Sequence, residues 1–268
     1  MSAARPEKVR EKSRHFSFTF GWVEGFPPDE REVRLPPNRT LPEFDEPPTT
    51  VLSRAGSGLK DFELLRARVE WVEQRNARYG RRDLTEVIFF DYAFIFVPEE
   101  EPSLWIIRGK SLTARRLLGQ LSRFRPSEIR VLRCVYSLER IREQAGPYLR
   151  GLWMRVTGDH HLSSAAVFGR EVDQSPMTQT FLEREDVEVS TVYLDPRAFE
   201  EDAEEWKDEV LRFGCQVIIS RRGTIGLRIS EHLTDEEALS LALRLHRRFE
   251  QIGAAQKEKE KEESEAGG

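Results

Sequence analysis

The sequence has little cysteine, two residues in 268, and this scarcity excludes several small-domain architectures. Cys134 and Cys215 stand far apart, and neither belongs to a CxxC pair. Disulfide scaffolds and zinc ribbons need more cysteines at closer spacing. We therefore expect two ordinary buried thiols and no metal site.

Long apolar runs are also missing. The most apolar segment, residues 87–97, is eleven residues long and contains Asp91, whereas a membrane-spanning helix needs about 20 apolar residues. Glu7 and Glu11 interrupt the basic N-terminus and no apolar stretch follows, so neither a secretory signal nor a transit peptide fits. These absences predict a cytoplasmic protein without a membrane partner.

Sequence signatures of catalysis are lacking as well. The patterns GxSxG, HExxH and GxGxxG do not occur. Gly109-Lys110-Ser111 matches the end of a phosphate-binding loop, but Leu104 stands where that loop needs its first glycine. The Asp-His-His triplet at 159–161 resembles that of a phosphoesterase family, without the upstream ligands that such a site requires. We therefore expect a binding protein with no catalytic residue, no cofactor and no metal ligand.

Apolar residues recur with both the strand period and the helix period, which predicts an α+β fold. Residues 103–118 and 224–239 align without gaps, and each reads as a strand, a Leu-Thr pair and a helix. We predict two pseudo-symmetric hairpin-plus-helix lobes that share antiparallel sheet. The predicted boundaries are an extended proline-rich arm at 1–60, lobes at 61–147 and 148–253, and a disordered charged tail at 254–268.

Individual elements follow from the local patterns. Strands are predicted at 86–97, 103–108, 129–136, 149–157, 187–194, 216–220 and 224–230. Residues 61–79 fit either a helix face or a strand, and both interpretations stay open. Helices are predicted from Ser111 or Thr113, from Ser137 to Gly146, from Asp195 to Phe213, and from Thr234, where Glu237 completes a capping box.

The proline-rich arm contains one strand pattern, in which large aromatic residues occupy every second position. These residues are Phe16, Phe18, Phe20 and Trp22. A strand with one aromatic face does not stay exposed. Two interpretations are open: an edge strand docked on the body, or a strand that captures a partner by strand addition. On either interpretation the prolines predict that the body folds without the arm.

Charge is distributed unevenly along the chain. Residues 104–133 hold eight basic residues against Glu128, a net charge of +7, and residues 183–209 hold twelve acidic residues against three basic ones, a net charge of −9. Two arginines fall in the first turn of the helix predicted at 111–124, where positive charge opposes the helix dipole unless an anion compensates. The predicted anion or nucleic-acid binding residues are Arg108, Lys110, Ser111, Arg115, Arg116, Arg123 and Arg125.

Three interpretations of the charge pattern remain open: the two stretches solvate or face each other, the basic stretch binds nucleic acid or another polyanion, or one of them binds a protein. Our first functional hypothesis is a non-catalytic accessory protein that binds nucleic acid or another polyanion through the basic stretch. The alternative is an interaction subunit of a larger assembly that uses the aromatic N-terminal strand. A divergent enzyme is the third hypothesis.

Overall fold

The computed structural model describes residues 14–26, 32–35, 47–56, 59–79, 82–158, 162–195, 216–229 and 233–266. It contains helices and a large antiparallel sheet, which confirms the α+β fold class. The chain divides into two compact units, each assembled from separate segments. The hairpin unit comprises Ser17–Ser137, Ser220–Ile225 and Leu239–Gly268, and the β8 unit comprises Met1–Phe16, Leu138–Ile219 and Gly226–Ala238. This division differs from the continuous lobes predicted from the sequence.

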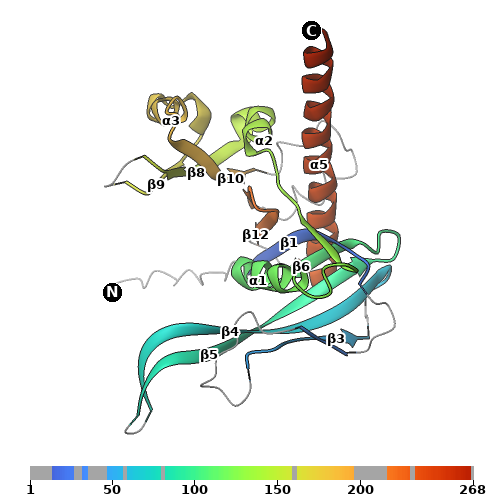
Figure 1. The fold of residues 1–268 in the computed structure, drawn as a ribbon. Helices are drawn as coiled ribbons and strands as arrows, with labels where there is room; N and C mark the ends of the chain where they lie inside the picture. Colours follow the sequence, from blue (N-terminus) through green and yellow to red (C-terminus); the bar gives the residue numbers. More distant parts are fainter. Residues whose placement is uncertain are drawn as a thin grey trace, which may run out of the picture. The chain divides into compact units, whose positions relative to one another are not determined.

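The hairpin unit is built on antiparallel strands that neighbour one another in the order β2-β3-β4-β5-β6-β1, with β7 also paired to β1. Their bounds are β1 Arg14–Glu24, β2 Glu32–Leu35, β3 Thr50–Ala55, β4 Phe62–Tyr79, β5 Arg82–Pro98, β6 Leu104–Arg108 and β7 Arg130–Arg133. Figure 1 shows β4 and β5 as one long curved hairpin. Residues 61–79, which the sequence left ambiguous, form β4, and the register of β4 on β5 runs from Phe62 opposite Pro98 to Tyr79 opposite Arg82.

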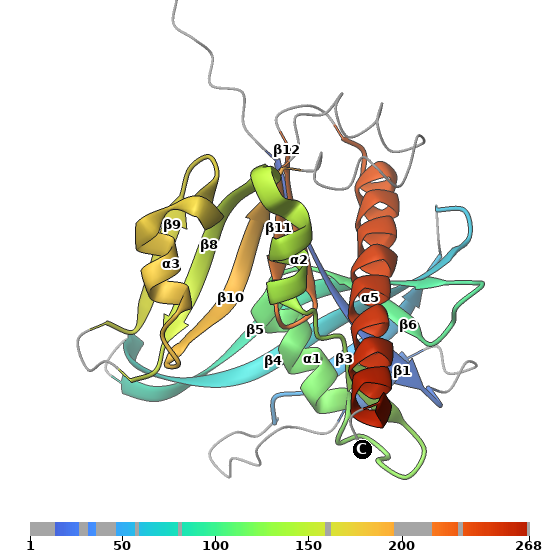
Figure 2. The same ribbon diagram turned by 90° about the horizontal axis from the view of Figure 1, so that it is seen from above.

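Two helices cover the two faces of this sheet. Helix α1 (Ser111–Leu121) packs on the face that contains Gly21, because a Cβ atom at Gly21 would lie 3.1 Å from Leu118. Helix α5 (Asp235–Ala266), which Figure 2 shows as one long helix, packs on the opposite face of the sheet. Phe20, the residue before Gly21, points to that face, and its ring stacks on His246 with 4.3 Å between the ring centroids. Successive residues of a strand point to opposite faces, so β1 contacts α1 through its odd-numbered residues and α5 through its even-numbered ones.

The aromatic strand at 16–22 lies inside this sheet. Phe18 and Phe20 have no exposed surface, and Phe16 is buried. β6 pairs along one edge of β1 from Phe18 to Trp22, while β7 pairs with Gly21–Glu24 on the other edge. A strand bonded along both edges is neither an edge strand nor free for strand addition. Its three phenylalanine rings are core residues, and Trp22 is half-buried. We therefore expect the body to need this strand in order to fold, contrary to the expectation from the proline content.

The β8 unit contains a second antiparallel group of strands. Its strands are β8 Leu149–Val156, β9 Ser164–Phe168, β10 Val187–Leu194, β11 Gln216–Ser220 and β12 Thr224–Ile229, the last two of which begin or end in the hairpin unit. β8 pairs with β10 on one side and with β9 on the other, and α2 (Leu138–Ala145) packs against β10. A short helix, α3 (Pro176–Leu182), lies beside this group in Figure 2.

The local patterns predicted most of these elements. The strands expected at 149–157, 187–194, 216–220 and 224–230 are confirmed within one residue at each end. So is the capping box of α5, in which the Thr234 N–H donates to the Glu237 carboxylate at 2.8 Å and the Glu237 N–H donates to Thr234 Oγ1 at 3.2 Å. The expected strand at 129–136 is shorter, at 130–133, and the expected helix at 195–213, including Trp206, lies outside the described residues.

At its other end, α5 continues to Ala266, where a disordered tail was expected from residue 254. The alternating charges of this tail leave no apolar face, a pattern that favours disorder in isolation. Lysine, glutamate, glutamine and alanine are nevertheless strong helix formers, so a helix that is already nucleated can extend through them.

We predict that Phe20→Ala lowers the free energy of unfolding by about 3–5 kcal/mol, because the substitution empties a fully buried site between β1 and α5. Phe90→Ala is the matched control, since more than half of the Phe90 surface is exposed. Its expected cost is below about 1 kcal/mol. Urea denaturation measures both values, and equal losses for the two variants would contradict the central position of β1.

A second prediction concerns Asp91, whose carboxylate accepts hydrogen bonds from Lys110 Nζ at 3.0 Å and Thr113 Oγ1 at 3.1 Å. Partial burial raises the pKa of Asp91, but these bonds and one from the Tyr92 N–H outweigh it and lower the pKa below 3.8. The folded state therefore favours the ionised form, so the stabilisation is present at neutral pH and is lost as the pH falls through the lowered pKa.

Asp91→Asn should accordingly destabilise the protein by about 1–2 kcal/mol at neutral pH and by much less in acid. Chemical denaturation at a series of pH values checks this difference. Glu128→Gln is the control, because its pairing with Arg125, at 3.8 Å, is exposed and worth little. A cost for Asp91→Asn that does not change with pH would contradict the assignment.

Candidate anion-binding site

Three arginines from separate parts of the hairpin unit line one cavity of about 390 Å³. Arg115 comes from the first turns of α1, Arg133 from the end of β7, and Arg222 from the turn between β11 and β12. The remaining lining residues are Thr19, Leu118, Cys134 and Val135. We call this space the arginine cavity.

Strand geometry places Arg133 on this side of the sheet. Arg133 lies opposite Gly21 in the β1–β7 register, and Gly21 faces Leu118 of α1. The glycine at position 119 makes room for the arginine, since a Cβ atom there would lie 3.3 Å from a guanidinium nitrogen of Arg133. Gly119 thus lets the guanidinium approach α1, and Gly21 lets Leu118 of α1 approach β1.

The turn that carries Arg222 is fixed by backbone contacts. The Phe20 N–H donates to the Gly223 carbonyl at 2.9 Å, and the Tyr136 N–H donates to the Arg221 carbonyl at 3.2 Å. Gly223 has a φ of +73°, and a Cβ atom there would lie 2.5 Å from the Cys134 carbonyl oxygen, so no other residue fits. The sequence Arg221-Arg222-Gly223 therefore holds Arg222 beside the cavity.

The start of α1 adds polar groups close to the arginines. The N-cap of α1 is Lys110, in extended conformation and without a side-chain capping bond, rather than the Ser111 or Thr113 expected from the sequence. Ser111 Oγ lies 3.3 Å from Thr224 Oγ1, which in turn lies 3.0 Å from the hydroxyl of Thr19 in the cavity wall. No acidic residue of α1 itself occupies its first turn, and the carboxylate at this helix start is that of Asp91 on β5, which is bonded to Lys110 and Thr113.

The electrostatics of the site centre on Arg115. Burial lowers the pKa of Arg115, and the charges of Arg222, Arg133 and Arg116 lower it further. Arg115 Nε donates a hydrogen bond to the Ser111 carbonyl oxygen at 3.3 Å. Because that oxygen carries no net charge, the bond does not neutralise the guanidinium. Among the described residues, no carboxylate forms an ion pair with any of the three cavity arginines. Like charges brought together in this way repel, and an anion in the cavity would remove the repulsion.

The other residues predicted for this site lie elsewhere. Lys110 pairs with Asp91, Arg116 pairs with Glu73 at 3.4 Å and lies 4.0 Å over the Trp71 ring, and Arg125 pairs with Glu128. Arg108 ends β6, and Arg123 follows the end of α1. Of the seven predicted residues, only Arg115 lines the arginine cavity.

Two of the three cavity arginines were absent from the predicted site. Arg133 belongs to the basic stretch, and Arg222 lies in a predicted hairpin turn far along the chain. Alternation could have located Arg133, because odd-numbered residues of 130–136 share one face, whereas nothing in the sequence brings the 221–223 turn to α1.

The acidic stretch at 183–209 is described as far as Asp195, and two of its acidic residues there pair within the β8 unit. Arg184 contacts Asp186 at 2.8 Å, and Arg150 contacts Asp195 at 3.1 Å. Residues 196–209 lie outside the described residues, as does the Asp-His-His triplet at 159–161.

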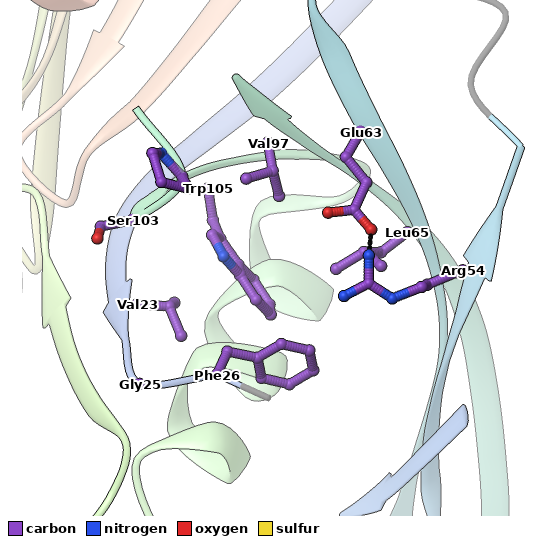
Figure 3. A pocket seen from close by; sticks show the side chains of 10 residues that line it. Val23, Gly25, Phe26, Arg54, Glu63, Leu65, Val97, Ser103 and Trp105 are labelled. Carbon is purple, nitrogen blue, oxygen red and sulfur yellow. Dashed lines mark ion pairs between the residues drawn. The ribbon is translucent and has the colours of Figure 1, made fainter. Parts of the chain in front are cut away.

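A second cavity, of about 240 Å³, lies on the α1 face of the same sheet and has a different character. Figure 3 shows the rings of Trp105 and Phe26 meeting edge to face in it, with a centroid separation of 5.0 Å. Arg54 and Glu63 form an ion pair across its side. Because that arginine is neutralised by its partner, this cavity offers no surplus charge to a ligand.

Comparisons with known proteins add no family to this description. No protein-family model matches the sequence, and no curated protein matches it. Among the described residues, no helix is both long and apolar enough to span a membrane. The functional argument therefore rests on the site itself.

We predict that replacing Arg115, Arg133 and Arg222 together by Gln leaves the free energy of unfolding unchanged or raises it, because the change removes repulsion and breaks no ion pair within the described residues. The gain should shrink with added salt, which screens the repulsion in the parent protein. Urea titrations at low and high salt measure this effect. A marked loss of stability would mean that the three arginines hold the fold together.

Proposed function

We propose that the protein is a non-catalytic binding protein for nucleic acid that holds backbone phosphates in the arginine cavity. The observation that carries this proposal is the convergence of Arg115, Arg133 and Arg222 on one cavity without a described carboxylate partner. Guanidinium groups bind phosphate through two parallel N–H donors, and these charge-assisted bonds are stronger than bonds between neutral groups. The proposal keeps the class of ligand expected from the sequence and moves its centre from the basic stretch to the cavity.

The lining of the cavity supports contact with phosphates rather than with bases. Its side chains are arginine, threonine, leucine, valine and cysteine, and no aromatic ring among the described residues lines it. Bases that splay from a single strand are usually held by aromatic stacking, and phosphates by arginine and hydroxyl groups. We therefore propose binding without sequence preference, driven by the release of counterions.

The nearest thiol supports a binding role over a catalytic one. Burial raises the pKa of Cys134 to about 12, so the thiolate that a nucleophilic cysteine needs is not formed at neutral pH. The thiol is also free, and free buried thiols are typical of reducing compartments. A cytoplasmic location is part of the proposal.

An exposed aromatic surface favours a second candidate function, that of an interaction subunit. Phe90, Tyr92 and Phe94 project from one face of β5 and are each about half exposed. Arg66 lies 4.4 Å over the Tyr92 ring, and Arg68 lies 4.8 Å over the Phe90 ring. A guanidinium group thus covers one face of the Tyr92 ring and one face of the Phe90 ring, which disfavours stacking of bases there. Exposed aromatic and arginine side chains together are typical of protein interfaces.

The first function is tested by fluorescence anisotropy with labelled single-stranded and double-stranded oligonucleotides over a salt series. We predict binding at low salt that weakens steeply as salt is added. The Gln variant of the three cavity arginines should bind at least tenfold more weakly at low salt. Its salt slope on duplex DNA should fall by about 0.9 for each phosphate that the variant no longer neutralises.

The control replaces three exposed arginines of the β8 unit, Arg155, Arg170 and Arg228, by Gln. This variant carries the same change in net charge and should bind nearly as well as the parent. Equal weakening in both variants would show that net charge rather than the cavity governs binding. Failure of the parent protein to bind either oligonucleotide at low salt would refute the nucleic-acid function. A partner subunit that copurifies with the parent, and is lost on Phe90→Asp with Phe94→Asp, would then favour the second candidate.

A further inference from the structure

On the α5 side of the sheet, three side chains with metal-binding chemistry lie together in the hairpin unit. A thiol, an imidazole and a carboxylate, from Cys134, His246 and Glu250, have ligand atoms that all fall within 4.8 Å of one another. Cys134 follows β7, while the other two belong to α5 and stand four residues apart. Residues at this spacing lie one above the other on a single helix face, as paired helical metal ligands do.

Its neighbours fix the orientation of the His246 ring. The Tyr136 hydroxyl lies 2.9 Å from His246 Nδ1, and the Phe20 ring stacks on the imidazole with an angle of 12° between the ring planes. His246 Nε2 is thereby directed toward Glu250, whose carboxylate oxygen lies 3.7 Å away. An imidazole that binds a metal through one nitrogen usually has its other nitrogen held by a hydrogen bond of this kind.

The distances suit a small tetrahedral ion. Zinc lies about 2.0 Å from nitrogen or oxygen and about 2.3 Å from sulfur, so its ligand atoms are about 3.3–3.6 Å apart. The 3.7 Å between His246 Nε2 and the Glu250 oxygen is within a few tenths of an ångström of this value. The remaining separations, at most 4.8 Å, need only a small rotation of a side chain to close. Glu250 is partly exposed, which leaves that rotation open to it.

The charges also balance. The imidazole of His246 would coordinate as a neutral ligand, whereas Cys134 and Glu250 would bind as a thiolate and a carboxylate. Burial raises the pKa of Cys134 and of Glu250, and a hydrogen bond joins these two side chains to each other. A divalent cation would balance those two negative charges, and the thiol proton would pass to solvent. Trp22 hydrogen-bonds both groups, which favours their anionic forms.

We propose that Cys134, His246 and Glu250 bind a zinc ion. A thiolate and an imidazole are donors that zinc prefers and that magnesium and calcium do not, and a carboxylate completes a common zinc set. Three protein ligands leave the fourth tetrahedral position to water. The sequence hides this site, because its cysteine and its helical pair lie far apart along the chain. Zinc binding does not require an anion in the arginine cavity, although Cys134 also lines that cavity.

The test uses the full-length protein without an affinity tag that binds metals. The protein is dialysed against excess zinc and then against metal-free buffer, and the retained metal is measured by mass spectrometry. We expect about one zinc ion per chain. Loading with cobalt instead should produce the visible bands of a tetrahedral site and a near-ultraviolet thiolate-to-cobalt band.

Cys134→Ser should abolish the thiolate-to-cobalt band and weaken zinc binding at least tenfold, and Glu250→Gln should weaken binding while keeping that band. Tyr136→Phe tests the positioning role of the hydroxyl, with an expected loss of about 10–100-fold in affinity. Cys215→Ser is the matched control and should bind like the parent. Melting curves with and without zinc accompany each variant, and only the zinc-binding proteins should be stabilised.

The proposal is overturned if the parent retains no zinc, or if cobalt gives no thiolate band. It is equally overturned if Cys215→Ser rather than Cys134→Ser removes the bound metal. Glu250→Gln guards against a variant that does not fold, since Glu250 is partly exposed and its isosteric replacement keeps the shape of the side chain.

Discussion

The alternation of side chains along β1 and along residues 130–136 is the constraint on which the hairpin unit depends. β1 is hydrogen-bonded to β6 on one edge and to β7 on the other, so it lies in the interior of the sheet. A helix can therefore pack against each of its two faces. Thr19, Gly21 and Val23 face α1, while Phe18, Phe20 and Trp22 face the opposite side. A slip of one residue would exchange the two sets and place aromatic rings where α1 needs a glycine.

The same alternation separates two kinds of chemistry on either side of one short segment. Arg133 and Val135 line the arginine cavity, whereas the side chains of Cys134 and Tyr136 meet His246 of α5. Positive charge therefore accumulates on the face of α1, where no described carboxylate pairs with the three arginines. Neutral hydrogen-bonding groups accumulate beneath α5, where burial disfavours charge. A single extended segment thus serves both sites, and Cys134 belongs to both, because it also lines the arginine cavity.

Patterns that act over short distances in the sequence predicted the fold class, most strand positions and the start of α5 well. The capping box at Thr234 and Glu237 is local, and so is the β6-to-α1 connection. β4 stayed ambiguous because Leu65, Val69 and Val72 fit a helix while Ala67 and Trp71 fit a strand, and only pairing with β5 decides between them. The central place of β1 was missed for the same reason, since its partners β6 and β7 lie far away in the sequence.

The candidate site shows a sharper limit. Counting arginines along the chain treats Arg115 and Arg116 alike, yet one lines the cavity and the other stacks on Trp71. Their directions differ because adjacent residues of a helix point about 100° apart. Arg222 reaches the site because backbone hydrogen bonds from Phe20 and Tyr136 hold the 221–223 turn in place. No local sequence pattern predicts these long-range hydrogen bonds. Linear charge density therefore predicted the class of ligand that we propose, and the fold decides which side chains can bind it.

The most direct test of the central claim is a thermal melt of the parent protein in inorganic pyrophosphate, compared with sodium chloride at equal ionic strength. An anion that binds the folded arginine cavity stabilises it by mass action, whereas general screening is the same in both solutions. The account predicts a higher Tm in pyrophosphate for the parent and no such difference for Arg115→Gln. An equal rise in both proteins, or none in the parent, would contradict it.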